Sequence, residues 1–172
     1  MTRSWNVKSL AHLILWVLAV LLALPAAAAV FTVTTAEDND TADPAQPMSL
    51  RKAIRLANST PGRDTIQFNI GGSGTARIVL QNDPARGDAS LPDLLDSVVI
   101  DGYTQPGATP NSLAEGNNAV LRIEIDASNT IASYSRGLLI AASNCEVRGL
   151  IINNCLEAGI IVLLRQVCVR DW

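Results

Sequence analysis

The chain has 172 residues, of which 48% are hydrophobic and 4% aromatic, and its 13 basic and 16 acidic side chains give a formal net charge of −3. This length supports one domain with a modest core, and the acidic balance argues against nucleic acid as a partner. The single histidine, His12, lies in the N-terminal segment, which excludes catalytic triads and His-based metal sites from the rest of the chain.

The first 29 residues predict a secretory signal peptide. A basic segment precedes an apolar run over residues 13–24, and Pro25 and four alanines follow it. This order is typical of a leader that is removed during export, here after Ala28 or Ala29. We therefore expect a secreted or cell-surface protein, which in a bacterium means an outer-membrane or extracellular one.

An uncleaved membrane anchor is the alternative for this segment, because the apolar run extends to residue 31 and approaches the length that a bilayer requires. Pro25 and the alanines favour cleavage. Loss of Arg3 and Lys8 with the leader leaves 11 of the 13 basic side chains against 16 acidic ones, a formal charge of −5.

The mature chain, residues 30–172, begins with an expected strand over residues 30–35 and an acidic loop over residues 37–43. We interpret the loop as a solvated turn. A calcium loop is the alternative, but the segment lacks the central glycine, and Ser49 stands where a closing glutamate is required.

One helix is expected over residues 50–57, with Ser49 as its N-cap. Its apolar positions fall on one face, whereas Arg51, Lys52 and Arg55 are expected to face water. A short amphipathic helix at this point, within residues 49–58, predicts a lid that covers the open apolar end of the structure that follows.

Further strands are expected at residues 65–70 and 76–80, separated by a glycine turn at 71–74. A β-branched run ending at Asp101 then recurs before Asp126 and again before Asn153, at intervals of 25 and 27 residues. Short strands closed by Asp, Asn or Gly at this period indicate a solenoid of stacked β-coils, from about residue 65 onward. Residues 102–118, rich in Gly, Pro and Asn, predict a projecting loop.

Two motifs carry a family resemblance: the helix Ser49-Leu50-Arg51-Lys52-Ala53-Ile54 and the strand and turn Ile100-Asp101-Gly102-Tyr103-Thr104-Gln105-Pro106-Gly107. The chain up to about residue 162 resembles exported bacterial proteins with a CSLREA-type N-terminal region. The resemblance implies an all-β fold, a right-handed parallel β-helix of the pectin-lyase-like superfamily. Met48 replaces the cysteine of the motif and Lys52 its acidic residue, so both departures lie in the lid.

The C-terminal residues 163–172 contain neither Gly nor Asn to turn the chain. Strand-like residues 138–140 and 160–162 are 22 positions apart, which is one coil, so the stack breaks off where it becomes regular. We expect a truncated piece of a longer β-helix; an improvised C-terminal cap is the alternative. An unfinished stack predicts self-association through its open C-terminal coil.

Three cysteines, Cys145, Cys155 and Cys168, lie near the C-terminus. Cys145 and Cys155 can meet in adjacent coils as a disulfide, but small apolar residues of a core explain them as well. No CxxC spacing supports a zinc site, and no cofactor is expected.

Two function classes remain open. The first is a non-catalytic module for adhesion, display or passenger structure, with a polysaccharide or another cell-surface component as its partner. The second is a polysaccharide lyase or glycoside hydrolase, in which Asp101 and Asp126 lie one coil apart, about 5 Å, as the carboxylate pair. Asp and Asn also end strands because they bond the turning backbone. Sugar clefts favour aromatic platforms, and few aromatic residues follow the leader, so we favour the module. The aromatic residues after the leader are Phe31, Phe68, Tyr103, Tyr134 and Trp172.

Overall fold

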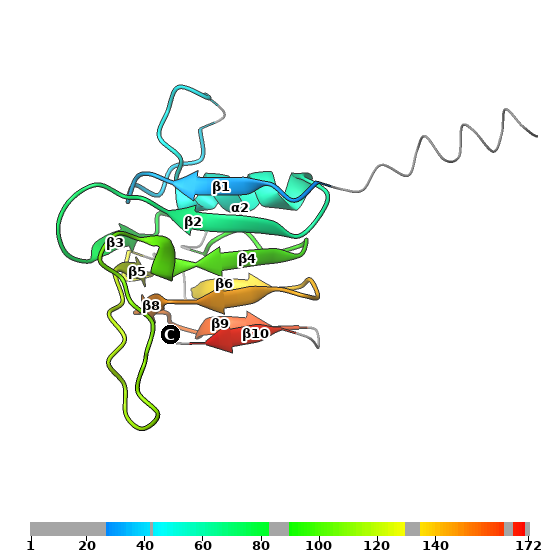
Figure 1. The fold of residues 1–172 in the computed structure, drawn as a ribbon. Helices are drawn as coiled ribbons and strands as arrows, with labels where there is room; N and C mark the ends of the chain where they lie inside the picture. Colours follow the sequence, from blue (N-terminus) through cyan, green and yellow to red (C-terminus); the bar gives the residue numbers. More distant parts are fainter. Residues whose placement is uncertain (1–26, 42, 83–89, 130–134, 164–166, 171–172) are drawn as a thin grey trace, which may run out of the picture.

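The computed structural model describes residues 27–41, 43–82, 90–129, 135–163 and 167–170. These residues form mostly β-strands in parallel sheets, with little helix, as the all-β prediction requires. Strands that are far apart in the sequence lie above one another in a stack (Figure 1). The elements in chain order are β1 (Val30–Val33), α2 (Leu50–Ser59), β2 (Asp64–Phe68), β3 (Ala76–Val79), β4 (Val98–Asp101), the 3-10 helix η1 (Gly102–Thr104), β5 (Ile123–Asp126), β6 (Arg136–Ile140), β7 (Glu146–Arg148), β8 (Leu150–Asn153), β9 (Ala158–Val162) and β10 (Cys168–Arg170).

Three sheets contain these strands. A five-stranded sheet has the order β1-β2-β4-β7-β10, a three-stranded sheet β3-β5-β8 and a two-stranded sheet β6-β9, and all the strand pairs are parallel. Leu94 forms a further parallel bridge with Ile140, on the other side of β6 from β9. From β4 onward the chain visits the five-, three- and two-stranded sheets in that order, twice, before it returns to the first.

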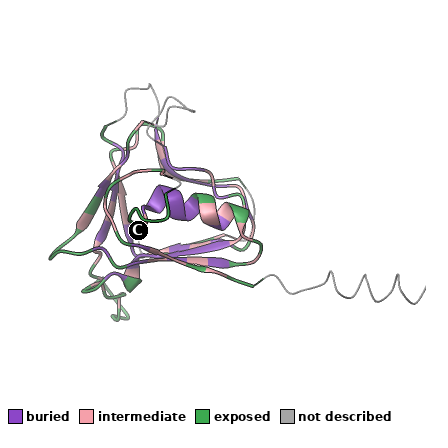
Figure 2. Cartoon of the chain, turned by 90° about the horizontal axis from the view of Figure 1, so that it is seen from above, coloured by how far each residue is buried: buried purple, intermediate pink, exposed green. Residues whose placement is uncertain are grey.

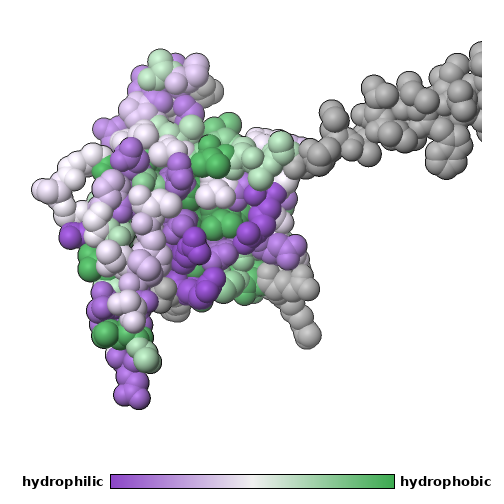
Figure 3. All heavy atoms as spheres, in the orientation of Figure 1, coloured by the Kyte–Doolittle hydropathy of each residue, from purple (hydrophilic) through white to green (hydrophobic). Residues whose placement is uncertain are grey.

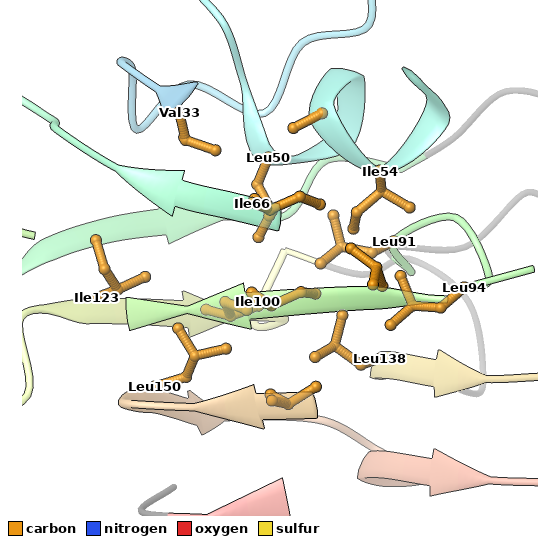
Figure 4. Packing of buried hydrophobic residues seen from close by; sticks show 14 of the residues in the cluster. Val33, Leu50, Ile54, Ile66, Leu91, Leu94, Ile100, Ile123, Leu138 and Leu150 are labelled. Carbon is orange, nitrogen blue, oxygen red and sulfur yellow. The ribbon is translucent and has the colours of Figure 1, made fainter. Parts of the chain in front are cut away.

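The register of the five-stranded sheet sorts its residues into rows. The alternate positions that pair across all five strands point inward and form one apolar row: Phe31, Ile66, Ile100, Val147 and Val169. Side chains from the other two sheets and from α2 join the same hydrophobic core, so the sheets share one interior (Figure 4). Burial of this row favours the parallel register, because a one-residue slip would turn the apolar side chains to water.

The 22-residue interval near the C-terminus is confirmed, because residues 22 positions apart pair with each other in β6 and β9. Leu138, Leu139 and Ile140 of β6 pair with Ile160, Ile161 and Val162 of β9. The other expected repeat is only partly right. The third version of the repeated run, residues 145–154, divides at Gly149 into β7 and β8, and these belong to different sheets.

Helix α2 closes one end of the stack next to β1 (Figure 1). The Ser49 side chain accepts a hydrogen bond from the Lys52 amide, which confirms the predicted N-cap. Seen from above, the helix lies within the outline of the strands, and much of it is buried (Figure 2). Leu50, Ala53 and Ile54 are fully buried in the common core.

Two basic side chains of α2 do not face water, contrary to expectation. Arg51 is 4% exposed and holds Asp38 through Nε (2.8 Å) and Nη2 (2.7 Å), and its Nη1 donates to the carbonyl of Ser90. Lys52 is 9% exposed and donates to the Asp43 carbonyl. Part of the acidic loop is therefore tied to the helix, because the Asp38 carboxylate and the Asp43 carbonyl bind cations that the helix brings inward, while Glu37 and Asp40 stay exposed as in the predicted solvated turn.

The first strand is shorter than expected. The amides of Thr34 and Thr35 both donate to the Met48 carbonyl, so the chain leaves the sheet after Val33. By contrast, the predicted glycine turn after β2 is confirmed, with Gly72 and Gly74 at φ of +107° and +98°.

We expect Ile54→Asp to destabilise the protein by about 4 kcal/mol or more, because Ile54 is fully buried and the new carboxylate would have no partner there. The matched control is Arg55→Ala on the exposed side of the same helix, which removes a surface ion pair with Asp40 and should cost less than about 1 kcal/mol. Chemical denaturation of both variants measures the difference. Equal midpoints would contradict a packing role for α2.

Candidate functional site

The turn after β4 is built by side chains that bond to the backbone. The Asp101 carboxylate accepts from the Tyr103 amide at 3.1 Å and so caps η1. Thr104 Oγ1 accepts from the Phe68 amide at 2.7 Å. Gln105, 4% exposed, uses both ends of its amide on the backbone of Ile70, at 2.9 and 2.8 Å. The residues of the Asp101–Gln105 motif therefore fix the turn and tie it to the end of β2.

Two glycines, Gly102 and Gly149, lie in close contact, and this contact fixes the position of the Tyr103 ring. A Cβ on Gly102 would lie 2.0 Å from the Gly149 carbonyl oxygen, so only glycine fits there. Gly149 has a φ of +69°, and a Cβ at this residue would lie 3.0 Å from ring atoms of Tyr103. The tyrosine ring thus lies against the turn between β7 and β8.

On the outward face of the five-stranded sheet, the strands β4, β7 and β10 carry charged side chains in one row. The register aligns Asp101, Arg148 and Arg170 on successive strands. Arg148 donates to Asp101 at 2.7 Å and to Glu146 at 3.1 Å. Glu146 also accepts from Arg170 at 2.6 Å and from Arg63 at 3.3 Å. We call these five residues the arginine cluster; its three guanidinium groups exceed its two carboxylates by one charge.

The cluster stabilises the charged forms of Glu146 and Arg148. Burial alone raises the pKa of Glu146, but hydrogen bonds and charge from Arg170, Arg148 and Arg63 outweigh it and lower the pKa below its usual value. The hydrogen bond that Arg148 donates to Asp101, with the charges of Asp101 and Glu146, raises the pKa of Arg148 despite partial burial. Neither Glu146 nor Arg148 is thus placed to exchange a proton near neutral pH.

A hollow of about 300 Å³ lies beside the cluster and is lined by Tyr103, Pro110, Arg148 and Arg170. Hydrophilic side chains gather on this face of the molecule (Figure 3). Two guanidinium groups next to an aromatic ring can bind a carboxylate or sulfate group on a sugar, because arginine pairs with planar anions and the ring stacks on apolar faces. A second hollow of about 440 Å³ is lined by Arg63, Glu146 and residues flanking β7 and β10.

Asp126 lies elsewhere, so the pairing with Asp101 that the enzyme alternative requires is not present. Asp101 ends β4 in the five-stranded sheet opposite Gln67 and Arg148, whereas Asp126 ends β5 in the three-stranded sheet opposite Val79 and Asn153. Equal intervals in the sequence do not imply one sheet here, since the chain also crosses between sheets within each interval. Asp126 and Asn153 do occupy equivalent positions.

Asp126 is fully buried, and its carboxylate is satisfied by hydrogen bonds. It accepts from the Ser128 amide and hydroxyl, both at 3.0 Å, from Asn154 at 2.7 Å and from Arg77. Burial by itself raises the pKa of Asp126, but the hydrogen bonds from Asn154, Ser128 and Arg77 prevail and lower it. A carboxylate so engaged stabilises a turn and does not serve as an acid or a nucleophile.

The three cysteines are free thiols in the structure, Cys145 buried, Cys155 half-buried and Cys168 exposed. Burial raises the pKa of Cys145 and of Cys155, which makes both poor nucleophiles. In the described part of the chain, no group of three or more His, Cys, Asp or Glu side chains is arranged to hold a metal ion.

No protein-family model matches the chain, and neither a curated protein nor a solved structure gives a match. Within the described ranges, none of the helices has the length and apolar character to cross a membrane. The site must therefore be interpreted from its own geometry.

Sequence reasoning missed the arginine cluster. Arg148 and Arg170 are 22 positions apart, the interval between β6 and β9, and this was the one signal available for their alignment. Arg63 lies before β2 and meets Glu146 only because β2 and β7 flank β4. Of the expected aromatic residues, Tyr103 lines the hollow, whereas Tyr134 and Trp172 lie outside the described residues.

We expect Asp126→Asn to reduce the loss of stability in acid. Because folding lowers the pKa of Asp126, its ionised form stabilises the protein above the unfolded value of about 3.9, and this contribution disappears as the pH falls through the lower folded value. Thermal melts from pH 5 to pH 2.5 should show a smaller decline for the variant than for the wild type. Glu115→Gln, in an exposed loop, is the control. Parallel declines for wild type and Asp126→Asn would contradict the assignment.

Proposed function

We propose that the chain is the N-terminal part of an exported, non-catalytic right-handed parallel β-helix module, and a piece of a longer protein of this kind. The support is the cyclic order in which the strands join three parallel sheets, together with pairing in register between successive passes of the chain. Helix α2 lies over the end of the core next to β1, as a lid on such a stack would.

We further propose membership in the CSLREA-type exported proteins of the pectin-lyase-like superfamily. Both motifs behind the resemblance have structural roles that suit the N-terminal end of such a stack. Ser49 caps α2 and Ile54 packs into the core, while Thr104 and Gln105 bond the backbone at the end of β2. Met48 packs at the edge of the core, where the motif has a cysteine.

One observation carries the choice of a non-catalytic role: neither candidate carboxylate is available. Asp101 caps a turn and pairs with Arg148, and Asp126 accepts from Ser128, Asn154 and Arg77. The two also lie in different sheets, so they do not flank one sugar bond as a glycosidase pair must. The module would serve adhesion, display or passenger structure at the cell surface.

The alternative function is action on an acidic polysaccharide, as a lyase or a glycoside hydrolase. The hollow beside the arginine cluster favours it, because Arg148, Arg170 and Tyr103 present two cations and a ring. The same features suit binding without catalysis, which keeps a polysaccharide as a partner of the module.

An activity assay separates the two functions. Purified protein should release neither reducing ends nor unsaturated product from pectin, alginate or related polymers. Retention on immobilised pectin or alginate is measured in parallel, with Arg148→Gln/Arg170→Gln compared with Arg55→Gln on α2 at the far end of the stack. Turnover that is lost in Asp101→Asn or Asp126→Asn would overturn the non-catalytic assignment.

We also expect self-association through the end of the stack opposite α2. Among the described strands, β10 and β9 lie at the edges of their sheets, and Val162 and Leu163 are 45% and 61% exposed next to that edge. An open parallel edge with apolar side chains favours pairing with a second copy. Ile161→Lys with Leu163→Lys should shift the protein toward monomer in analytical ultracentrifugation. A clean monomer of the unmodified protein would contradict the expectation.

A further inference from the structure

A buried carboxylate lies where the chain enters the fold. Asp64, the first residue of β2, is 0% exposed and shares the inward face of the strand with Ile66 and Phe68. Its Oδ1 accepts from the backbone amide of Ala29 at 2.7 Å. Its Oδ2 is buried without a hydrogen-bond partner in the described structure.

This arrangement is incomplete as it stands. A carboxylate in an apolar interior is costly unless a cation or several donors compensate for its lost hydration. Among the ion pairs of the described residues, none involves Asp64. A single amide donor therefore faces a carboxyl group that can accept several hydrogen bonds.

Ala29, which already contacts Asp64, can supply the missing hydrogen-bond donor. Ala29 is held in place, because its carbonyl accepts from the Thr65 amide at 2.8 Å, whereas Ala27 and Ala28 are exposed. The bond between Ala28 and Ala29 is one of the two cleavage positions that the leader allows. Cleavage there would turn the Ala29 amide into an α-ammonium group with three donors and a positive charge.

We propose that export ends with cleavage between Ala28 and Ala29, and that the new α-ammonium group of Ala29 forms a buried ion pair with Asp64. Hydrolysis consumes one water, breaks the amide bond, and leaves a carboxylate on Ala28 and an amine on Ala29 that takes up a proton. The ammonium donates to Oδ1 and supplies the donor for Oδ2. This inference rests on export, which is part of the proposed function.

The structure also distinguishes between the two cleavage positions. Cleavage after Ala29 would remove the donor to Asp64 and the acceptor of the Thr65 amide together. It would leave the buried carboxylate without a partner and place the exposed Val30 at the terminus. Cleavage after Ala28 retains both contacts and adds a charge, so Ala29 belongs to the mature protein.

The first test is the N-terminal residue of the exported protein, determined by mass spectrometry after expression of the full chain with its leader in a bacterium. We expect Ala29. A start at Val30 would overturn this inference and leave export intact, whereas a retained Met1 would overturn both.

The second test is the titration of the Ala29 amine in the exported protein, followed by NMR of labelled alanine. Pairing with Asp64 should raise its pKa above the ordinary value of an α-amine, about 7.7–8.0. Asp64→Asn, which retains the shape and one acceptor, should return it to that value, and Glu37→Gln in an exposed loop should not. An ordinary pKa in the wild type would overturn the ion pair.

The pH dependence of stability provides an independent test, because an Asp64 with only a packing role would not make the stability change with pH in this way. An amine whose pKa is raised by folding stabilises the protein below its unfolded pKa, and this contribution is lost as the pH rises through the folded value. The melting temperature of the wild type should therefore exceed that of Asp64→Asn at pH 7, and the difference should shrink by pH 10. A difference that is constant over this range would count against the proposal.

Discussion

The structure depends on one constraint, the parallel register that stacks like side chains on like. The inner row of the five-stranded sheet runs from Phe31 through Ile100 to Val169, and each member meets an apolar neighbour on the next strand. Neighbouring strands are about 4.8 Å apart, so branched side chains in such a row exclude water along its length. The turns must therefore bring the chain back in the same register on each pass, one strand spacing further along the stack. Side-chain hydrogen bonds to the backbone, such as those of Asp101, Thr104 and Gln105, meet this requirement.

The same constraint explains why strand-ending carboxylates are poor evidence for catalysis here. A strand end exposes backbone amides that need acceptors, and a short carboxylate two residues earlier reaches them, as Asp101 does for Tyr103 and Asp126 does for Ser128. Once an arginine from a neighbouring strand adds its charge, the carboxylate has no spare capacity for substrate. Charged groups also lie on the outer surface, where the register aligns Arg148 and Arg170 beside a tyrosine held by a glycine contact.

The two ends of the stack differ in how the apolar interior is covered. At the β1 end, α2 covers the core, and its buried Arg51 is compensated by Asp38 from the loop that folds over it. The N-terminal segment enters beside β2 through Ala29 and the buried Asp64. At the β10 end, the sheet order stops with exposed apolar side chains next to it. Within the described residues the two ends therefore differ, because α2 covers one of them and β10 is the edge strand at the other.

The sequence by itself determined the local structure: the Ser49 cap and helix, the strands, the glycine turn and the 22-residue register of β6 with β9, because each depends on short-range pattern and turn chemistry. Only the tertiary structure decided which strand joins which sheet. Asp101 and Asp126 therefore separate although their sequence positions look equivalent, and Arg51 becomes buried although its helix position indicates solvent. The physical reason is that sheet membership depends on how far the chain turns between strands, and burial of a charge depends on a partner that a distant loop supplies.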